Sequence, residues 1–330
     1  MYIEGQTLDD LLQPVFRRAL KSQVITRSSK GPARELMGVM LKLTNPRARF
    51  SRTERRATLL SCLGETLWYF SGSDALAVVE HYIPAYREFI GVSKRAMRAP
   101  GAYGPRIFGG KAPSQIDRVI ELLRRKPDTR QAVVQLYRSG DLGKKDVPCT
   151  CTLQFMARGG RMHMMTSMRS NDAYLGLPHD VFAFTLLQEV VARTMGCELG
   201  EYNHSVGSLH LYEEHERRAR EYLDEGWQDK LSMPAMPVGD PWNAIEWLLD
   251  KEARIRCGVL DIGDATAIDP FWVDLARLLL VHAHLKRKDR RAIVEVKNAM
   301  AAGVYDAFIR AKATSVPAPV DAPLLEWTKP

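Results

Sequence analysis

The sequence lacks the features of a secreted or membrane protein. Its first segment, MYIEGQTLDDLLQPVF, has no basic start followed by an apolar stretch, so it does not resemble a secretory signal. No window approaches the roughly 18 to 20 uninterrupted apolar residues that span a bilayer. The five cysteines are odd in number and scattered, which does not suit a disulfide framework. We therefore expect free thiols and a cytoplasmic protein without a membrane partner.

Patterns for binding nucleic acid are missing as well. The net charge is +8, and the basic residues gather in TNPRARFSRTERRA, SKRAMRAPGAYGPRIFGG, IELLRRKPDTR and HLKRKDRRA. A cationic surface serves nucleic acid and small anionic substrates alike. The chain nevertheless has no repeat, no zinc-finger spacing and no aromatic-interleaved RNA-binding motif. We interpret most of these charges as solvated faces and do not expect nucleic acid as a partner.

What is present is an ordinary globular composition, 45% apolar and 26% charged, with both helix and strand patterns. Apolar residues at helical spacing predict three helices, over 56–70, 115–125 and 181–195. β-Branched residues predict a strand over 131–137, and two alternating runs around Gly159–Gly160 predict a β-hairpin over 152–170. The segment 201–215 is typical of a strand that leads to a loop or helix. Together these elements indicate an α+β protein.

Only the C-terminal segment departs from this pattern. Residues 315–330, SVPAPVDAPLLEWTKP, are rich in Pro and Ala and predict a tail that runs over the surface or closes over a site. No linker divides the rest of the chain. We therefore predict a single domain over 1–330.

Cys149 is the first candidate for chemistry. It follows Pro148 at the mouth of the predicted hairpin, where a thiol can face a cleft while a strand holds it in place. A packed, unreactive cysteine is the alternative, because free Cys usually behaves as a small buried hydrophobe. The Cys149-Thr150-Cys151 triplet does not predict zinc, since a zinc site needs about four ligands. Three later histidines also match no familiar zinc spacing: His204, His210 and His215. We expect no metal.

Six segments, in order, resemble the signature segments of the thymidylate synthase family: ETLWYFSG, GAYG, PDTR, PCTCTLQF, RSNDAYLGLPHD and GSLHLYEEH. The resemblance runs from about Arg27 to Tyr212, and its Arg-Ser-x-Asp-x-x-Leu-Gly-x-Pro motif is highly specific. It implies an α+β thymidylate synthase-like fold, in which helices pack on a mixed β-sheet and a face of the sheet forms a homodimer interface. It also implies two small-molecule substrates, a nucleotide monophosphate and the co-substrate 5,10-methylenetetrahydrofolate.

The resemblance also implies roles for individual residues. Cys149 would add to C6 of a pyrimidine nucleotide, Glu65 would organise water and proton transfers, and Tyr103 would help to remove the C5 proton. The nucleotide would be bound by Arg27, Arg130, Gln154, Arg169, Ser170, His210 and Tyr212, with Arg130 contributed across the dimer interface. The folate would be bound by Asp172, Trp68 and Gly176. Directly after Arg130, where the family usually has a second arginine, this chain has Gln131. An amide does not reproduce the bidentate contacts of a guanidinium.

Structural explanations compete with several of these roles. Glu65 suits a charge on a helix surface, and Tyr103 suits an ordinary loop aromatic. Asp172 suits a turn, and His210 suits a histidine that is hydrogen-bonded in the core. It is the retention of thiol, Glu65, Tyr103 and arginine together that favours catalysis.

Asp180 marks a departure from the thymidylate synthases. They end this motif with Pro-Phe-Asn, whose amide reads the uracil edge, whereas this chain has Pro178-His179-Asp180. A carboxylate accepts from an exocyclic amine and pairs with a protonated ring nitrogen, but it cannot donate to uracil O4. An unpaired buried acceptor costs about 1–3 kcal/mol. Asp180 could instead cap a helix that begins near Val181, although Asn caps equally well.

The aspartate makes the sequence resemble the phage deoxycytidylate hydroxymethylases and the CMP hydroxymethylases of nucleoside-antibiotic pathways. In those relatives water, rather than a hydride, attacks the exocyclic methylene. Other departures also indicate an altered site, among them Thr150, Ala173 and Ser208. We predict a homodimeric cytidylate 5-hydroxymethylase, with CMP slightly favoured over dCMP. The alternatives are a divergent thymidylate synthase acting on dUMP and a catalytically silent nucleotide- or RNA-binding relative.

Overall fold

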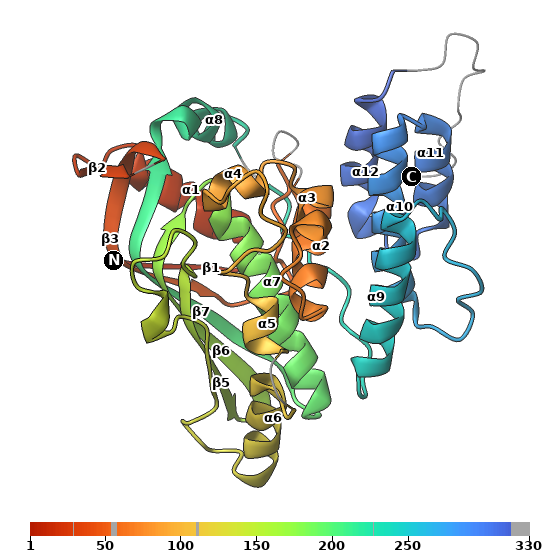
Figure 1. Ribbon diagram of the computed structural model, residues 1–330. Coiled ribbons are helices and arrows are strands. Elements are labelled where there is room, and N and C mark those ends of the chain that lie inside the picture. Colours follow the sequence, from red (N-terminus) through yellow and green to blue (C-terminus); the bar gives the residue numbers. More distant parts are fainter. Residues whose placement is uncertain (29, 54–57, 110–111, 227, 318–330) are drawn as a thin grey trace. The chain divides into compact units, whose positions relative to one another are not determined.

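The computed structural model describes residues 1–28, 30–53, 58–109, 112–226 and 228–317 (Figure 1). The chain forms two compact units, Met1–Ser232 and Met233–Pro330. The prediction of a single domain over 1–330 stays a prediction. Of the predicted tail, residues 318–330 lie outside the described residues.

The first unit is built on a seven-stranded mixed sheet in the order β1-β3-β7-β6-β5-β4, with β2 also paired to β3. The strands are β1 (Tyr2–Gly5), β2 (Ile25–Ser28), β3 (Gly31–Leu43), β4 (Val133–Gln135), β5 (Thr150–Arg158), β6 (Arg161–Asp172) and β7 (Glu198–Tyr212). The β1–β3 and β6–β7 pairs are parallel, and the other pairs are antiparallel. This sheet with its helices confirms the predicted α+β class.

The predicted hairpin is formed by β5 and β6. Gly159 and Gly160 join the two strands with φ values of 56° and 71°, a left-handed backbone that glycine adopts without a clash at Cβ. At the open end of the hairpin, the backbone N–H of Arg169 donates to the carbonyl of Cys149 at 2.9 Å. The hairpin thus places the predicted nucleophile, Cys149, beside the predicted nucleotide-binding residue Arg169.

Eight helices of the described chain belong to the first unit: α1 (Leu8–Ala19), α2 (Leu59–Phe70), α3 (Leu76–Tyr82), α4 (Tyr86–Ile90), α5 (Gly104–Ile107), α6 (Gln115–Arg125), α7 (Gly176–Thr194) and α8 (Glu213–Asp224). The prediction of a helix over 115–125 is confirmed by α6. Ser114 caps α6 by accepting from the N–H of Asp117, and the Asp117 carboxylate accepts in return from the N–H of Ser114.

Helix α7 is the central buried helix, and Figure 1 shows it lying across the sheet. It begins at Gly176, five residues before the predicted start at 181, because Pro178 fits the first turn, where a missing N–H leaves no hydrogen bond unmade. Asp180 therefore lies inside the helix. The interpretation of Asp180 as a cap for this helix is wrong.

The second unit is helical in its described part. It contains α9 (Trp242–Arg256), α10 (Pro270–Arg287), α11 (Arg290–Ala299) and α12 (Asp306–Thr314). Its core centres on α10, where Leu275, Ala276 and Leu278 have no exposed surface. In the parts of the chain that the structure describes, no helix is both long enough and apolar enough to span a membrane.

Candidate active site

The ends of three strands bring most of the predicted site residues together. β6 and β7 run parallel, with Asp172 paired to His210 near their ends. β5 is antiparallel to β6 and starts at Thr150, which is paired to Met168. The same end of the strands therefore carries Cys149, which precedes β5, and residues 169–172, which close β6.

Cys149 is a half-buried free thiol. The Nη2 atom of Arg169 lies 3.7 Å from its sulfur, while Nε donates to the Pro148 carbonyl at 3.0 Å. Burial raises the pKa of the Cys149 thiol, and the positive charges of Arg169 and Lys30 act against this rise. Arg169 is therefore the nearest charge that favours the reactive thiolate.

Replacement of Arg169 by Gln should lower the reactivity of Cys149. Loss of the guanidinium raises the thiol pKa further, and one pKa unit changes the thiolate fraction about tenfold. We expect alkylation of Cys149 by iodoacetamide at pH 8 to slow by about tenfold, measured by mass spectrometry of the Cys149 peptide. The matched control is Arg161→Gln, at the exposed start of the same strand. Equal rates in the two variants would show that Arg169 does not activate the thiol.

Tyr103 is held directly beside the nucleophile. Its hydroxyl oxygen accepts from the backbone N–H of Thr150 at 3.2 Å and from the Thr150 hydroxyl at 3.1 Å. Burial raises the pKa of Tyr103 well above its usual value, and the negative charges of Asp180 and Cys149 raise it further. Tyr103 therefore keeps its proton and serves as a hydrogen-bond donor toward the site. Thr150, a departure from the family pattern, is explained as the residue that holds this hydroxyl.

Glu65 is buried, with both carboxylate oxygens hydrogen-bonded. Tyr69, one turn along α2, donates to Oε1 at 2.7 Å, and His179 Nδ1 lies 2.6 Å from Oε2. Burial alone would lower the pKa of His179, but the neighbouring Cys62 and Glu65 outweigh it, so the pKa is raised well above its usual value. The sequence prediction missed Tyr69 and His179 as partners of Glu65. The available signal was Glu65 and Tyr69 four residues apart on one helix.

Asp180 is 8% exposed and is hydrogen-bonded to a second predicted segment. Asn171 Nδ2 donates to Asp180 Oδ2 at 2.8 Å. Burial raises the pKa of Asp180 to about 8, with a further upward contribution from Glu65, while the Asn171 hydrogen bond acts in the opposite direction. At neutral pH the Asp180 carboxyl group is therefore mostly protonated. Sequence reasoning assigned no role to Asn171.

Asp172, His210 and Tyr212 form a further group at the strand ends. Asp172 Oδ1 accepts from the backbone N–H groups of Tyr174 and Leu175, at 2.7 and 3.1 Å. The His210 and Tyr212 rings meet edge to face with centroids 4.9 Å apart. Burial lowers the pKa of His210, and the negative charge of Asp172 acts against this shift. Asp172 is thus the turn residue that the sequence suggested, and it is also a neighbour of His210, a predicted nucleotide-binding residue.

The thymidylate synthase family model matches residues 8–244, more than half of the chain. The chain belongs to the thymidylate synthase family. It therefore has the family's folate-dependent one-carbon transferase activity on a nucleotide, with methylenetetrahydrofolate as co-substrate. The match ends inside α9, so α10, α11 and α12 lie beyond it.

The family's folate requires hydrogen-bond acceptors for its pterin ring, and Asp172 fits this need. Among the described residues, the hydrogen bonds to the Asp172 carboxylate go to Oδ1, and Oδ2 has no partner. A half-buried carboxylate oxygen of this kind can accept from a pterin N–H. Among the described ranges, no group of three or more His, Cys, Asp or Glu residues is placed to hold a metal ion.

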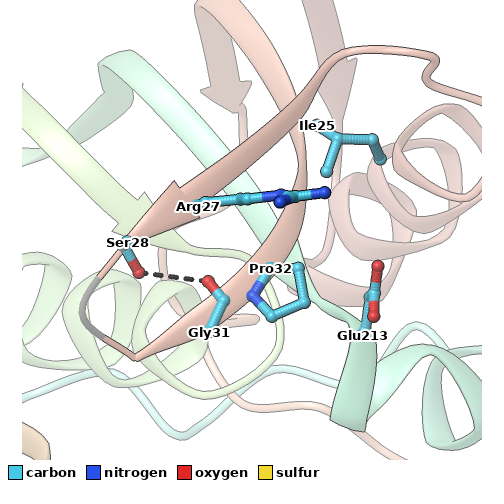
Figure 2. Close-up of a pocket in the computed structure, with 6 residues that line it drawn as sticks. All are labelled: Ile25, Arg27, Ser28, Gly31, Pro32 and Glu213. Carbon is cyan, nitrogen blue, oxygen red and sulfur yellow. Dashed lines mark hydrogen bonds between the residues drawn. The ribbon is translucent and has the colours of Figure 1, made fainter.

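Arg27 lines a pocket of about 400 Å³ at the β2–β3 hairpin (Figure 2). The lining residues are Ile25, Arg27, Ser28, Gly31, Pro32 and Glu213. Figure 2 shows the Arg27 side chain extending over this pocket. Ser28 Oγ lies 3.5 Å from the hydroxyl of Tyr212, another predicted nucleotide-binding residue. An exposed guanidinium here is accessible to a phosphate.

Arg130 and Gln154 are brought together at the β4–β5 edge. Gln154 Nε2 donates to the Arg130 backbone carbonyl at 2.9 Å, and the side chains of Arg130 and Gln131 are exposed. Within the described chain, no hydrogen bond joins either residue to Cys149. The exposure of Arg130 suits the predicted contribution to a partner subunit, which stays a prediction.

The structure gives packing reasons for Trp68 and Gly176. Trp68 has no exposed surface, and its ring packs edge to face on Tyr86 at a centroid distance of 5.3 Å. A Cβ at Gly176 would lie 2.9 Å from Asn171 Nδ2 and 3.6 Å from Asp180 Oδ2, so glycine leaves room for the Asn171–Asp180 hydrogen bond. Trp68 is therefore fully buried, whereas Gly176 is partly exposed. Their predicted roles in folate binding stay predictions.

Proposed function

We propose that this thymidylate synthase family member is a cytidylate 5-hydroxymethylase. It would transfer the one-carbon unit of 5,10-methylenetetrahydrofolate to C5 of CMP or dCMP and then add water. The observation that carries the proposal is the buried carboxyl group of Asp180 on α7. The resemblance to the family assigns the reading of the base to this motif position. The Asp180 carboxyl group interacts electrostatically with Tyr103 and Cys149, which supports a place beside the reacting ring.

The proton on Asp180 suits cytosine. A neutral carboxyl group has one hydrogen-bond donor and one acceptor. Cytosine presents an acceptor at N3 and a donor at its exocyclic amine, so both groups can pair without burying a net charge. The same hydrogen bond results whether a neutral carboxyl group meets neutral N3 or a carboxylate meets protonated N3, because one proton lies between the two groups. The raised pKa of Asp180 is consistent with this shared proton.

The residues around Cys149 supply the remaining steps of the proposed reaction. The Cys149 thiolate adds to C6, which makes C5 nucleophilic toward the one-carbon unit. The C5 proton then passes to a water that the Tyr103 hydroxyl holds by a hydrogen bond. The bond between the one-carbon unit and the folate nitrogen breaks, which releases tetrahydrofolate and leaves an exocyclic methylene on C5. Water then forms a bond to the exocyclic methylene, its proton passes to the hydrogen-bonded Glu65–His179 pair, and expulsion of Cys149 restores the C5–C6 double bond. The products are 5-hydroxymethylcytidylate and tetrahydrofolate.

Phosphate and sugar binding would fall to residues already placed around the strand ends. Arg169 Nη1 has no hydrogen-bond partner within the described part of the chain, which leaves it available to a phosphate that Ser170 and Arg27 would also contact. We propose that Arg130 completes this site from the partner subunit of a homodimer. Ala173 is fully buried, and its N–H donates to the His210 carbonyl at 2.8 Å. A small side chain there shapes the sugar pocket, and we favour CMP over dCMP.

Product analysis tests this proposal. The purified protein is given methylenetetrahydrofolate with CMP, dCMP or dUMP in separate reactions, and the nucleotides are analysed by mass spectrometry. We expect a hydroxymethyl group on one cytidylate and no oxidation of the folate to dihydrofolate. A methyl group on dUMP with dihydrofolate as product would replace the proposal by a divergent thymidylate synthase. Tight nucleotide binding without any product would indicate a catalytically silent relative.

The dUMP alternative has one observation in its favour. The same neutral carboxyl group could donate to uracil O4 and accept from N3–H if its two oxygens exchanged places. The distinction between the two bases therefore depends on which oxygen of Asp180 carries the proton.

A further inference from the structure

A chain of buried polar side chains leads from the sheet to Asp180. Tyr202 and His204 lie on β7, and Asn171 lies on β6. The exposed fractions are 0% for Tyr202 and His204 and 3% for Asn171. Polar groups at this depth destabilise a fold unless they are hydrogen-bonded. Because these side chains form one line that ends on Asp180, they can control the hydrogen bonding of its carboxyl group.

Each member of the chain lies within hydrogen-bond distance of the next. The Tyr202 hydroxyl is 2.8 Å from His204 Nδ1, and His204 Nε2 is 2.9 Å from Asn171 Oδ1. Asn171 Nδ2 donates to Asp180 Oδ2 at 2.8 Å. Among the described side chains, Asn171 is the one that donates a hydrogen bond to Asp180.

His204 fixes the direction of the Asn171 amide. Burial lowers the pKa of His204 to about 3, so the ring is neutral and has a single N–H. Asn171 Oδ1 can only accept, which places this N–H on Nε2. The Tyr202 hydroxyl lies beside Nδ1 and donates to Thr166 Oγ1 at 3.0 Å. The amide oxygen of Asn171 is thereby held by His204. Its NH₂ group is directed at Asp180.

We propose that His204 and Asn171 are positioning residues that make the two oxygens of Asp180 unequal and thereby select cytosine. This inference rests on the proposed function. Because Oδ2 accepts from Asn171, the proton of the neutral carboxyl group stands on Oδ1. Oδ1 then donates to cytosine N3, and Oδ2 uses its second lone pair to accept from the exocyclic amine. Uracil in the same place would meet donor with donor at N3 and acceptor with acceptor at O4.

The other charged groups around Asp180 do not supply this asymmetry through a hydrogen bond. The negative charges of Glu65 and Asp172 disfavour ionisation of Asp180, and the positive charge of His179 favours it. These are charge effects on the carboxyl group as a whole. The Asn171 N–H acts on one oxygen alone.

Four variants test the inference. Asn171→Leu removes the hydrogen-bond donor to Asp180. His204→Leu leaves the Asn171 amide free to rotate by half a turn, which exchanges its oxygen and its NH₂ group. His204→Gln is the conservative variant, because a glutamine NH₂ can still donate to Asn171 Oδ1. Gln188→Leu is the matched control: Gln188 is another fully buried amide, on α7, whose Nε2 donates to backbone carbonyls of β6 and β7, including that of Met162 at 2.8 Å.

The first measurement is independent of substrate. The ¹³C resonance of the Asp180 carboxyl carbon, assigned by its absence in Asp180→Asn, is followed against pH in the intact protein. We expect Asn171→Leu to raise the pKa of Asp180 above that of the wild type, since a donor to the carboxylate favours the charged form. Gln188→Leu should titrate like the wild type. If Asn171 had a structural role only, the pKa of Asp180 would shift in both variants or in neither.

The second measurement is selectivity, taken as kcat/KM for cytidylate over uridylate with the same sugar. We expect it to fall about tenfold in Asn171→Leu and His204→Leu, the size of one hydrogen bond to a titrating group, and to be kept in His204→Gln. If the variants keep both the selectivity and the titration of the wild type, the inference is overturned while the proposed function stands. If the wild type does not accept cytidylate, the proposed function fails, and the titration alone decides whether Asn171 positions Asp180.

Discussion

Replacement of Cys149 by Ala is expected to abolish one-carbon transfer, with a fall in kcat on the order of 10⁴- to 10⁶-fold. Cys149 is the thiol that lies 3.7 Å from the Arg169 guanidinium and next to the residue that holds the Tyr103 hydroxyl. Without addition of a thiolate to C6, C5 does not become nucleophilic, and the other residues have no intermediate to act on. Release of tritium from a C5-labelled nucleotide measures this step directly.

The matched control for Cys149→Ala is Cys151→Ala. Cys151 is another half-buried free cysteine, two residues along the same segment, and its described hydrogen bonds use its backbone carbonyl. We expect it to retain tritium release within a few-fold of the wild type. Release that survives in Cys149→Ala and is lost in Cys151→Ala would move the nucleophile to Cys151.

Replacement of Asp180 by Asn should change the preferred base. The Asn side chain can donate to uracil O4 and accept from N3–H. To donate to cytosine N3 and accept from the exocyclic amine, its amide would have to rotate by half a turn. We expect the ratio of kcat/KM for cytidylate over uridylate to fall by roughly 10³-fold, as two hydrogen bonds to buried groups are lost together. Competition between the two nucleotides in one reaction, followed by mass spectrometry, gives this ratio.

Asp172→Asn is the control for Asp180→Asn, because it is the same chemical change at a half-buried aspartate of the same segment. Asp172 accepts from backbone N–H groups and lies in the predicted folate site. Its replacement should lower turnover of both nucleotides without changing their ratio. A ratio that moves equally in the two variants would show that Asp180 does not read the base.

The family and the order of its local elements were predictable from the sequence. Six signature segments identify the thymidylate synthase family, and the family match over 8–244 agrees with them. The hairpin at Gly159–Gly160 and the helix over 115–125 were predictable because turn chemistry and apolar spacing act over a few residues. The start of α7 was misplaced because the first turn, Gly176 to His179, carries few apolar residues in a helical pattern.

The hydrogen bonds that tune the site were decided by the tertiary structure alone. His179 reaches Glu65 across 114 positions of the sequence, and His204 reaches Asn171 across 33. No local pattern encodes such pairs, since they form only when α7 packs on α2 and when β7 pairs with β6. Sequence reasoning could name Asp180 from its place in a motif. Its burial, its raised pKa and its hydrogen bond to Asn171 arise from the surrounding fold, because desolvation is a property of the packed core and not of the residue.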